Sequence, residues 1–187
     1  MNGSAAQEFL RNWEIAGTGF IIVSGSILHS VFGLTGRWPP MALIAAVNES
    51  VWEHLKLVFW PAFIFALVSY PVIRGKTENF FLAKSAAILA MPLIIAVLHY
   101  SYVWIFRHHN LAFDIGIFFG SAILGQMLCF RLLLKPRFPL IWQLAAAVLL
   151  LAATSAFSLL SYHPPRWPIF REAGSGRYGL QDGARTR

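Results

Sequence analysis

The chain alternates between long runs without charge and short segments that carry nearly all of its charged residues. Five runs lack Asp, Glu, Lys and Arg altogether, at 15–36, 57–73, 85–106, 115–129 and 138–165. Each run and its flanks supply about 20 residues, enough for an α-helix to cross a hydrocarbon core about 30 Å thick. A charge at the bilayer centre costs about 2.5–3.5 kcal/mol, so charges mark the helix ends. The pattern predicts transmembrane helices near 14–35, 49–73, 80–106, 111–134 and 139–162.

A shorter apolar segment, 40–47, lies between the first two predicted helices and is too short to cross a bilayer. We interpret it as a short interfacial or re-entrant helix. The predicted fold is therefore an all-α integral membrane bundle of about five transmembrane helices. The bundle occupies residues 1–162 as a single domain, and 163–187 form a flexible polar C-terminal tail unless Trp167, Phe170 or Tyr178 docks it on the bundle or on lipid headgroups.

Composition agrees with a membrane location and excludes a soluble nucleic-acid-binding domain. Of the 187 residues, 57% are hydrophobic and 12% are charged, against about 25% charged in an ordinary soluble domain. The net charge of +7 lies mostly in loops and tail, and the lipid bilayer is the expected partner. The single cysteine, Cys129, excludes an internal disulfide.

The loop charges predict an orientation. We call the face that carries the N-terminus side A and the opposite face side B. Seven Lys and Arg residues fall on side A, against three in the loops of side B. Five further Arg residues lie in the C-terminal tail on side B and favour the opposite orientation. If the loops dominate, since Lys and Arg concentrate in cytoplasmic loops, we expect a multipass protein of the cytoplasmic membrane with its N-terminus inside and its C-terminus outside. The side A residues are Arg11, Arg74, Lys76, Lys84, Arg131, Lys135 and Arg137; those of side B are Arg37, Lys56 and Arg107.

Ionisable side chains within the predicted helices indicate where a functional site lies. Such groups need a partner, a metal ion or water inside a membrane. Successive helices run in opposite directions, which brings all six histidines to the half of the bilayer on side B. The half on side A is expected to carry no acid between the helix ends. We therefore expect the site on side B, among His29, Glu49, Glu53, His54, His99 and Asp114.

Imidazole and carboxylate groups from several helices suit a divalent metal such as zinc. If Glu49 lies in the first turn of the second helix, capped by Asn48, then Glu49 and Glu53 share one face and His54 is rotated by about 100° from Glu53. The predicted metal ligands are then His29, Glu53, His99 and Asp114. Candidates for acid–base catalysis are Glu53, His54 and Asp114, and candidates for ligand binding are Glu49, Trp52 and His54.

Each of these residues also has a structural interpretation that the sequence leaves open. Glu53 can pair with Lys56, three residues along the helix. Glu49 and Asp114 can complement a helix dipole from the first turn. His29 and His99 can hydrogen-bond a serine or carbonyl of a neighbouring helix.

Three functions remain open at this stage. The first is a membrane protein whose polar cluster binds a small ligand, an ion or a partner. The second is a metal-dependent intramembrane hydrolase, and the third is a small ion or proton-coupled transporter. Gly116 and Gly120 add a GxxxG pair, which lets helices approach closely and suggests a homo-oligomer.

The segment Asn48-Glu49-Ser50-Val51-Trp52-Glu53-His54-Leu55-Lys56-Leu57 carries a resemblance to a known family. With His29 before it and the tail pattern that begins at Pro168 after it, the chain resembles a family of small bacterial multipass membrane proteins of unknown function. The resemblance implies a bacterial cytoplasmic membrane and supplies no activity. It directs attention to the block from Glu49 to His54.

Overall fold

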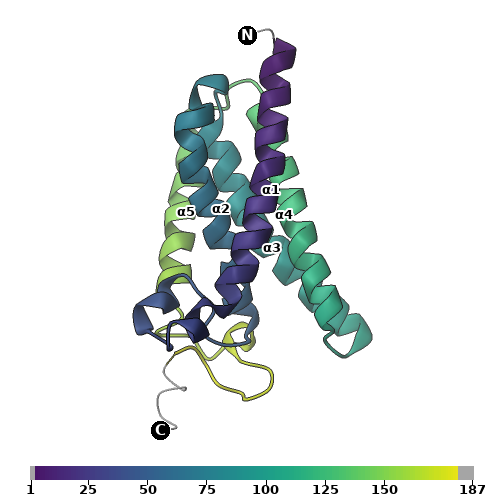
Figure 1. Ribbon diagram of the computed structural model, residues 1–187, viewed down its shortest axis with the longest axis vertical. Coiled ribbons are helices and arrows are strands. Elements are labelled where there is room, and N and C mark those ends of the chain that lie inside the picture. Colours follow the sequence, from purple (N-terminus) through teal and green to yellow (C-terminus); the bar gives the residue numbers. More distant parts are fainter. Residues whose placement is uncertain (1–2, 181–187) are drawn as a thin grey trace.

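The computed structural model describes residues 3–180, and its five long helices run alternately up and down (Figure 1). All five are long and apolar enough to cross a membrane, so the predicted all-α bundle of five spans is confirmed. Side A is at the top of Figure 1, and side B, with the chain that follows the last helix, is at the bottom. The helices are α1 (Gly3–Leu34), α2 (Val51–Ile73), α3 (Phe80–Phe106), α4 (Leu111–Leu133) and α5 (Leu140–Leu159).

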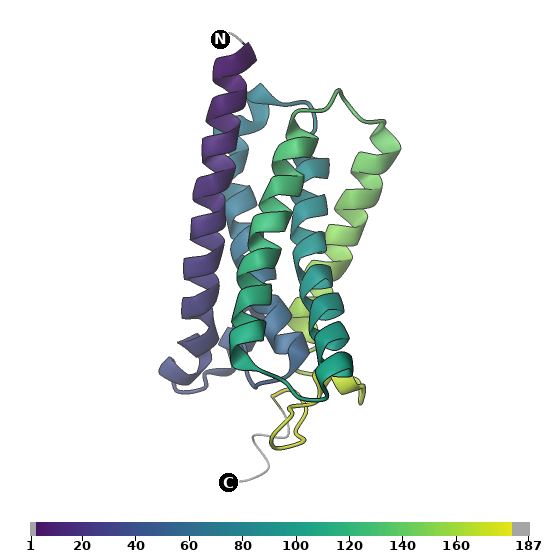
Figure 2. The same ribbon diagram turned by 90° about the vertical axis from the view of Figure 1, so that its right-hand side faces the viewer.

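Two helix starts differ from the prediction. α1 begins at Gly3 instead of residue 14 and projects beyond the other helices on side A (Figure 2). α2 begins at Val51, because the Ser50 hydroxyl accepts the Glu53 N–H and caps the helix. The prediction that Asn48 caps α2 is therefore wrong. The Asn48 side-chain oxygen instead accepts the Ser50 N–H at 3.0 Å, within the loop that precedes α2.

The short helix expected between the first two spans is present as the 3₁₀ helix η1 (Pro39–Leu43). Its Ala42 is fully buried and packs with Phe32 and Ala45 against the side B end of the bundle. Two further 3₁₀ turns are η2 (Arg74–Lys76) and η3 (Pro168–Phe170). The segment around η1 thus lies folded on the bundle, and it connects α1 to α2 on side B.

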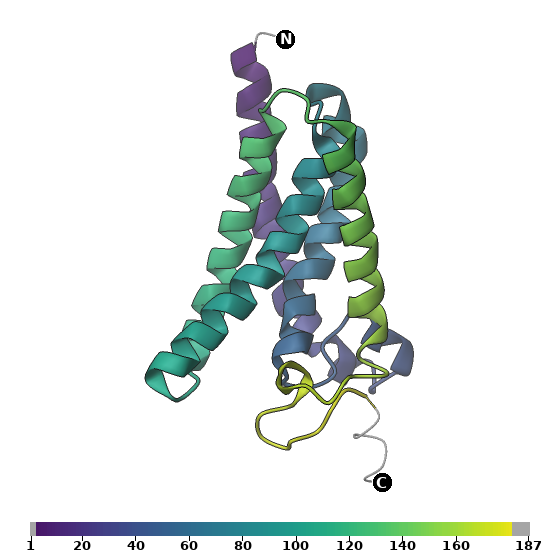
Figure 3. The ribbon, with the colours of Figure 1, turned by 180° about the vertical axis from the view of Figure 1, so that it is seen from behind.

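α2 is the most buried of the five helices, and residues such as Val58 and Phe59 are fully buried within the core. Seen from behind, the side B ends of α3 and α4 diverge from the rest of the bundle (Figure 3). α1, α2 and α4 nevertheless meet at Gly25. A Cβ atom there would lie 2.3 Å from the Leu57 carbonyl oxygen and 2.7 Å from the Phe118 ring. The absence of a side chain at Gly25 therefore allows this close packing.

Gly116 and Gly120 do not mediate packing within the described part of the chain. A Cβ atom at either position would meet nothing within 4 Å. The close glycine contact of α4 is at Gly125 instead, against Met91 of α3. A homo-oligomer that uses Gly116 and Gly120 stays a prediction.

Part of the predicted tail packs on the bundle. Phe170 is 3% exposed and lies against the rings of Trp52 and Trp167. The Leu180 N–H donates to the Ser161 carbonyl at 2.8 Å and returns the chain to the end of α5. Residues 181–187, the end of the predicted tail, lie outside the described residues.

Candidate functional site

Three side chains from three different segments converge on side B. His29 lies in the last third of α1, Glu49 lies in the loop before α2, and His54 lies in the first turn of α2. The Nε2 atoms of His29 and His54 lie 3.6 Å and 3.3 Å from the same carboxylate oxygen of Glu49. Among residues 3–180 this is the group of three or more His, Cys, Asp or Glu side chains whose ligand atoms all lie within 4.8 Å of one another.

The turn before α2 places Glu49 in this group. Because Ser50 is the cap, Glu49 precedes the helix and does not share a helical face with Glu53. The Glu49 N–H points to the Glu172 carboxylate of the tail, at 3.4 Å. The Glu49 side chain is thereby free to reach back to His54 from outside the helix.

The contacts of His54 show which of its two ring nitrogens carries a hydrogen and which faces Glu49. Nδ1 lies 2.9 Å from the Ser50 carbonyl oxygen, which can only accept, so Nδ1 carries a hydrogen. Nε2 therefore presents to Glu49 either a second proton or a lone pair. Two lone-pair acceptors 3.3 Å apart repel unless a proton or a cation lies between them. The site is accordingly built to hold a positive charge.

Glu49 is ionised in this setting. The hydrogen bond from His54 lowers the pKa of its carboxyl group below the ordinary 4.5, and burial opposes this effect only in part. Electrostatic interaction with the imidazoles of His54 and His29 lowers the pKa of Glu49 in the same direction as the hydrogen bond. A carboxylate at this position is thus available to bind a cation at neutral pH.

The group borders an open cleft of about 380 Å³ on side B. His29, Asn48 and Glu49 line its polar side, together with Arg37 from the turn after α1. Apolar side chains, including Phe32, line the remainder. The site is therefore accessible to a small molecule.

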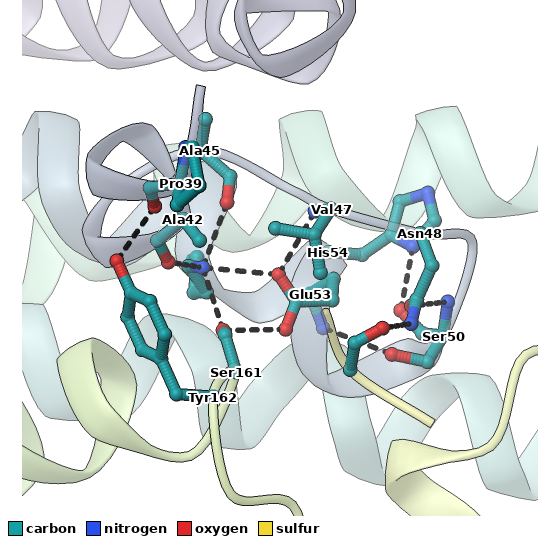
Figure 4. Close-up of polar contacts among 12 residues, drawn as sticks. Pro39, Ala42, Ala45, Val47, Asn48, Ser50, Glu53, His54, Ser161 and Tyr162 are labelled. Atoms are coloured by element: carbon teal, nitrogen blue, oxygen red, sulfur yellow. Dashed lines mark hydrogen bonds and ion pairs between the residues drawn. The ribbon is translucent and has the colours of Figure 1, made fainter. Parts of the chain in front are cut away.

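Glu53 belongs to a separate, buried network (Figure 4). One carboxylate oxygen accepts from Lys56 Nζ at 3.0 Å and from the Val47 N–H at 3.1 Å, and the other accepts from the Ser161 hydroxyl at 2.6 Å. Lys56 also donates to the carbonyl oxygens of Ala42 and Ala45. Both oxygens of Glu53 are thus occupied in joining α2 to the η1 segment and to the chain after α5.

The pairing of Glu53 with Lys56 is the structural alternative that the sequence left open, but its setting differs from the expected wet helix end. The side chains are 2% and 0% exposed. Burial converts a weak surface pair into a group of polar contacts that must all be satisfied.

His99 and Asp114 form a third group. His99 Nδ1 lies 2.8 Å from the Asp114 carboxylate, which also accepts from the Tyr102 hydroxyl at 2.6 Å. The four predicted metal ligands are therefore divided among three groups: His29 with Glu49 and His54, Glu53 with Lys56, and His99 with Asp114.

Trp52 faces the tail. Its ring stacks on Phe157 and Phe170, with centroids 4.6 Å and 4.7 Å away. The indole contributes to core packing at the end of α5 and is not among the residues that line the cleft.

The expectation that the half of the bundle on side A lacks an acid between the helix ends is wrong. Glu14 lies well inside the extended α1, and Lys84 Nζ donates to its two oxygens at 2.7 Å and 2.8 Å. The two side chains are 3% and 5% exposed. The prediction fails because residue 14 is the first residue of the predicted helix, where an acid would be solvated, whereas α1 continues to Gly3.

Sequence reasoning named His29, Glu49 and His54 but did not group them, and it missed Arg37. A signal for the grouping is present: Ser50-Val51-Trp52-Glu53 has the S-x-x-E spacing of a capping box. That spacing begins the helix at Ser50 and leaves Glu49 outside it. The convergence with His29 depends on packing between α1 and α2 and has no local signal.

The tail braces the loop that carries Glu49. Glu172 accepts from the Glu49 N–H, from Ser175 and from Arg177 Nε at 3.1 Å. Burial raises the pKa of the Glu172 carboxyl group, but these hydrogen bonds outweigh it and the net shift is downward. Glu172 is therefore ionised at neutral pH, and its charge holds the tail in place.

The Glu172→Gln variant should release this part of the tail. Without the carboxylate charge the contact to Arg177 weakens, and trypsin should cleave after Arg177 several-fold faster than in the wild type. Cleavage is followed by mass spectrometry in detergent at pH 8. Glu78→Gln, an exposed acid on side A, is the control. Equal cleavage rates in the two variants would contradict a bracing role for Glu172.

The sequence of this chain matches a known protein family over nearly its whole length. The model of a family of unknown function (DUF6512) matches residues 3–180, which is nearly the whole chain. The chain belongs to this family. The resemblance to an uncharacterised family is thereby confirmed, and the matched region of this DUF6512 protein includes all five helices and the braced tail. No curated protein and no solved structure matches the chain.

Proposed function

We propose that this protein binds a divalent transition metal, with zinc as the best fit, through His29, Glu49 and His54. The observation that carries the proposal is the spacing of the ligand atoms. Zinc bonds to imidazole nitrogen and carboxylate oxygen are about 2.0–2.2 Å long, so two ligands of a tetrahedral site lie about 3.3–3.6 Å apart. The two nitrogen-to-oxygen distances, 3.3 Å and 3.6 Å, have this value.

The surroundings of the site support the proposal. The Ser50 carbonyl holds Nδ1 of His54, as metal-bound imidazoles usually require, and leaves Nε2 for the ion. Two imidazoles and one carboxylate are a known ligand set of catalytic zinc, which keeps a fourth position for water or substrate. The cleft beside His29 and Glu49 supplies the space for that position.

A metal with an open position activates water or polarises a carbonyl or phosphoryl oxygen. Of the three functions considered from the sequence, we therefore favour a metal-dependent membrane protein of the hydrolase type. With the N-terminus in the cytoplasm, as the loop charges favour, the site faces the outside of the cytoplasmic membrane.

Metal content tests the proposal directly. The protein is purified in detergent, loaded with zinc and freed of excess ion. Its zinc content per chain is then measured by inductively coupled plasma mass spectrometry. The wild type should retain about one zinc ion per chain, because three ligands hold it. His29→Ala, Glu49→Gln and His54→Ala should each lose most of the bound metal.

His99→Ala is the matched control. It removes another histidine of side B that also pairs with a carboxylate, and it should retain zinc. Wild-type protein without bound zinc would overturn the proposal. Equal loss of metal in His99→Ala and His29→Ala would do so as well, since it would favour the ligand set expected from the sequence.

A further inference from the structure

We infer that the molecule bound beside the metal is anionic and carries a phosphate group, held jointly by the metal and by Arg37. This inference rests on the proposed function and adds the class of ligand to it. The same chemistry has two sources, a lipid headgroup and a soluble phosphate compound.

The first argument is the charge of the loaded site. As metal ligands, His29 and His54 are neutral, so Glu49 supplies the only negative charge among the ligands, against the double positive charge of the ion. Asp114 also acts on His54, but its carboxylate is already shared with His99 and Tyr102. Arg37, which lines the same cleft, adds a further positive charge. None of the ion pairs formed between residues 3–180 uses its guanidinium. The excess positive charge favours an anion in the cleft.

The second argument is how Arg37 is positioned. The chain leaves α1 through two residues in the left-handed conformation, Gly36 at φ 66° and Arg37 at φ 60°. The Arg37 N–H donates to the Phe32 carbonyl at 2.9 Å and closes the end of the helix. After this reversal Arg37 lies among the residues that line the cleft with His29 and Glu49. A guanidinium there offers paired N–H donors, the arrangement that suits phosphate oxygens.

The third argument is the apolar part of the cleft. Phe32, Leu34 and Val47 line it beside the polar residues. Leu34 and Trp38, at the end of α1, are 81% and 57% exposed, as expected for side chains at a membrane surface. The cleft therefore offers a charged end to a phosphate and an apolar wall to whatever the phosphate is attached to.

Cobalt provides the probe. Co²⁺ replaces zinc in such sites, and its visible absorption reports changes in coordination. The cobalt-loaded protein, in maltoside micelles that contain no phosphate, is titrated with inorganic phosphate in one arm and with phosphatidic acid in the other. Diacylglycerol, which lacks the phosphate, is the reference for the lipid arm. Both anions should change the cobalt spectrum, and diacylglycerol should not.

Arg37→Gln should bind cobalt like the wild type and should weaken the response to the anion by about tenfold to a hundredfold, the range for loss of one charge-assisted contact. Arg107→Gln is the matched control. Arg107 also has φ 60° and ends a helix on side B, but it does not line the cleft, and its variant should respond normally.

Each outcome bears on the inference. Saturation at lower concentrations of phosphatidic acid than of phosphate would support a lipid source, and the reverse would support a soluble one. A cobalt spectrum that neither anion changes would overturn the inference while the metal site stands, as would equal responses of Arg37→Gln and Arg107→Gln. Failure to bind cobalt would overturn the proposed function and this inference with it.

Discussion

Lys56→Met is expected to lower the free energy of unfolding by about 3–5 kcal/mol, the cost of removing one partner of a buried ion pair. Lys56 is fully buried, and its three N–H groups are shared among Glu53, Ser161 and the carbonyl oxygens of Ala42 and Ala45, all within hydrogen-bond distance of Nζ. Methionine fills a similar volume but donates no hydrogen bond. The Glu53 carboxylate then stays buried without its counter-charge.

The measurement is unfolding in mixed detergent micelles with increasing sodium dodecyl sulfate, followed by circular dichroism. Lys135→Met, at an exposed position between α4 and α5, controls for the loss of a positive charge and should change stability little. The double variant Glu53→Gln/Lys56→Met removes both charges and should regain much of the lost stability. A Lys56→Met variant as stable as Lys135→Met would show that the network does not support the fold.

Lys84→Met is expected to cause a loss of similar size, about 3–5 kcal/mol, at the other end of the bundle. Lys84 of α3 and Glu14 of α1 form an ion pair with both side chains at most 5% exposed. The Glu14 backbone carbonyl also accepts from the Gln126 side chain of α4 at 3.4 Å. The pair therefore lies where three helices meet, and its loss leaves a carboxylate without a counter-charge in an apolar setting.

Arg11→Met is the control for this variant. Arg11 pairs with Glu8 on the same helix at 3.7 Å, and both side chains are more than half exposed. Such surface pairs contribute about 0–1 kcal/mol. A Lys84→Met variant no less stable than Arg11→Met in the same detergent titration would contradict a buried, structural role for the pair.

The two variants also separate stability from the proposed site. Neither Lys56 nor Lys84 is among the three side chains assigned to the metal. Protein of either variant that remains folded in mild detergent should therefore bind zinc as the wild type does. Metal loss in folded Lys84→Met, on side A, would indicate that the bundle transmits strain to side B.

The comparison of Glu53 with Glu49 shows where sequence reasoning about the site reached its limit. The sequence predicts both acids on one helical face and Glu53 as a metal ligand. One residue decides otherwise: Ser50 caps α2, so Glu49 leaves the helix and turns to His54, whereas Glu53 points to Lys56 and Ser161. The cap is visible in the sequence, but Ser161 lies more than a hundred residues away from Glu53.

The buried position of Glu14 also could not be predicted from local sequence. Charge-free runs locate the apolar part of a helix, but they do not show how far the helix continues beyond it or what a flanking charge meets there. α1 continues to Gly3, and Lys84 lies beside Glu14 only because α1 and α3 pack together.

The sequence by itself determined that this protein has five helices long and apolar enough to cross a membrane, where the apolar part of each lies and that its histidines gather on side B. These features follow from the cost of placing charge in hydrocarbon, which applies to each segment separately. Only the tertiary structure decided which polar groups meet: His29 with Glu49 and His54, Glu53 with Lys56, His99 with Asp114, and Glu14 with Lys84. Such pairings depend on the rotation and packing of whole helices and on the turns between them, which no single segment specifies.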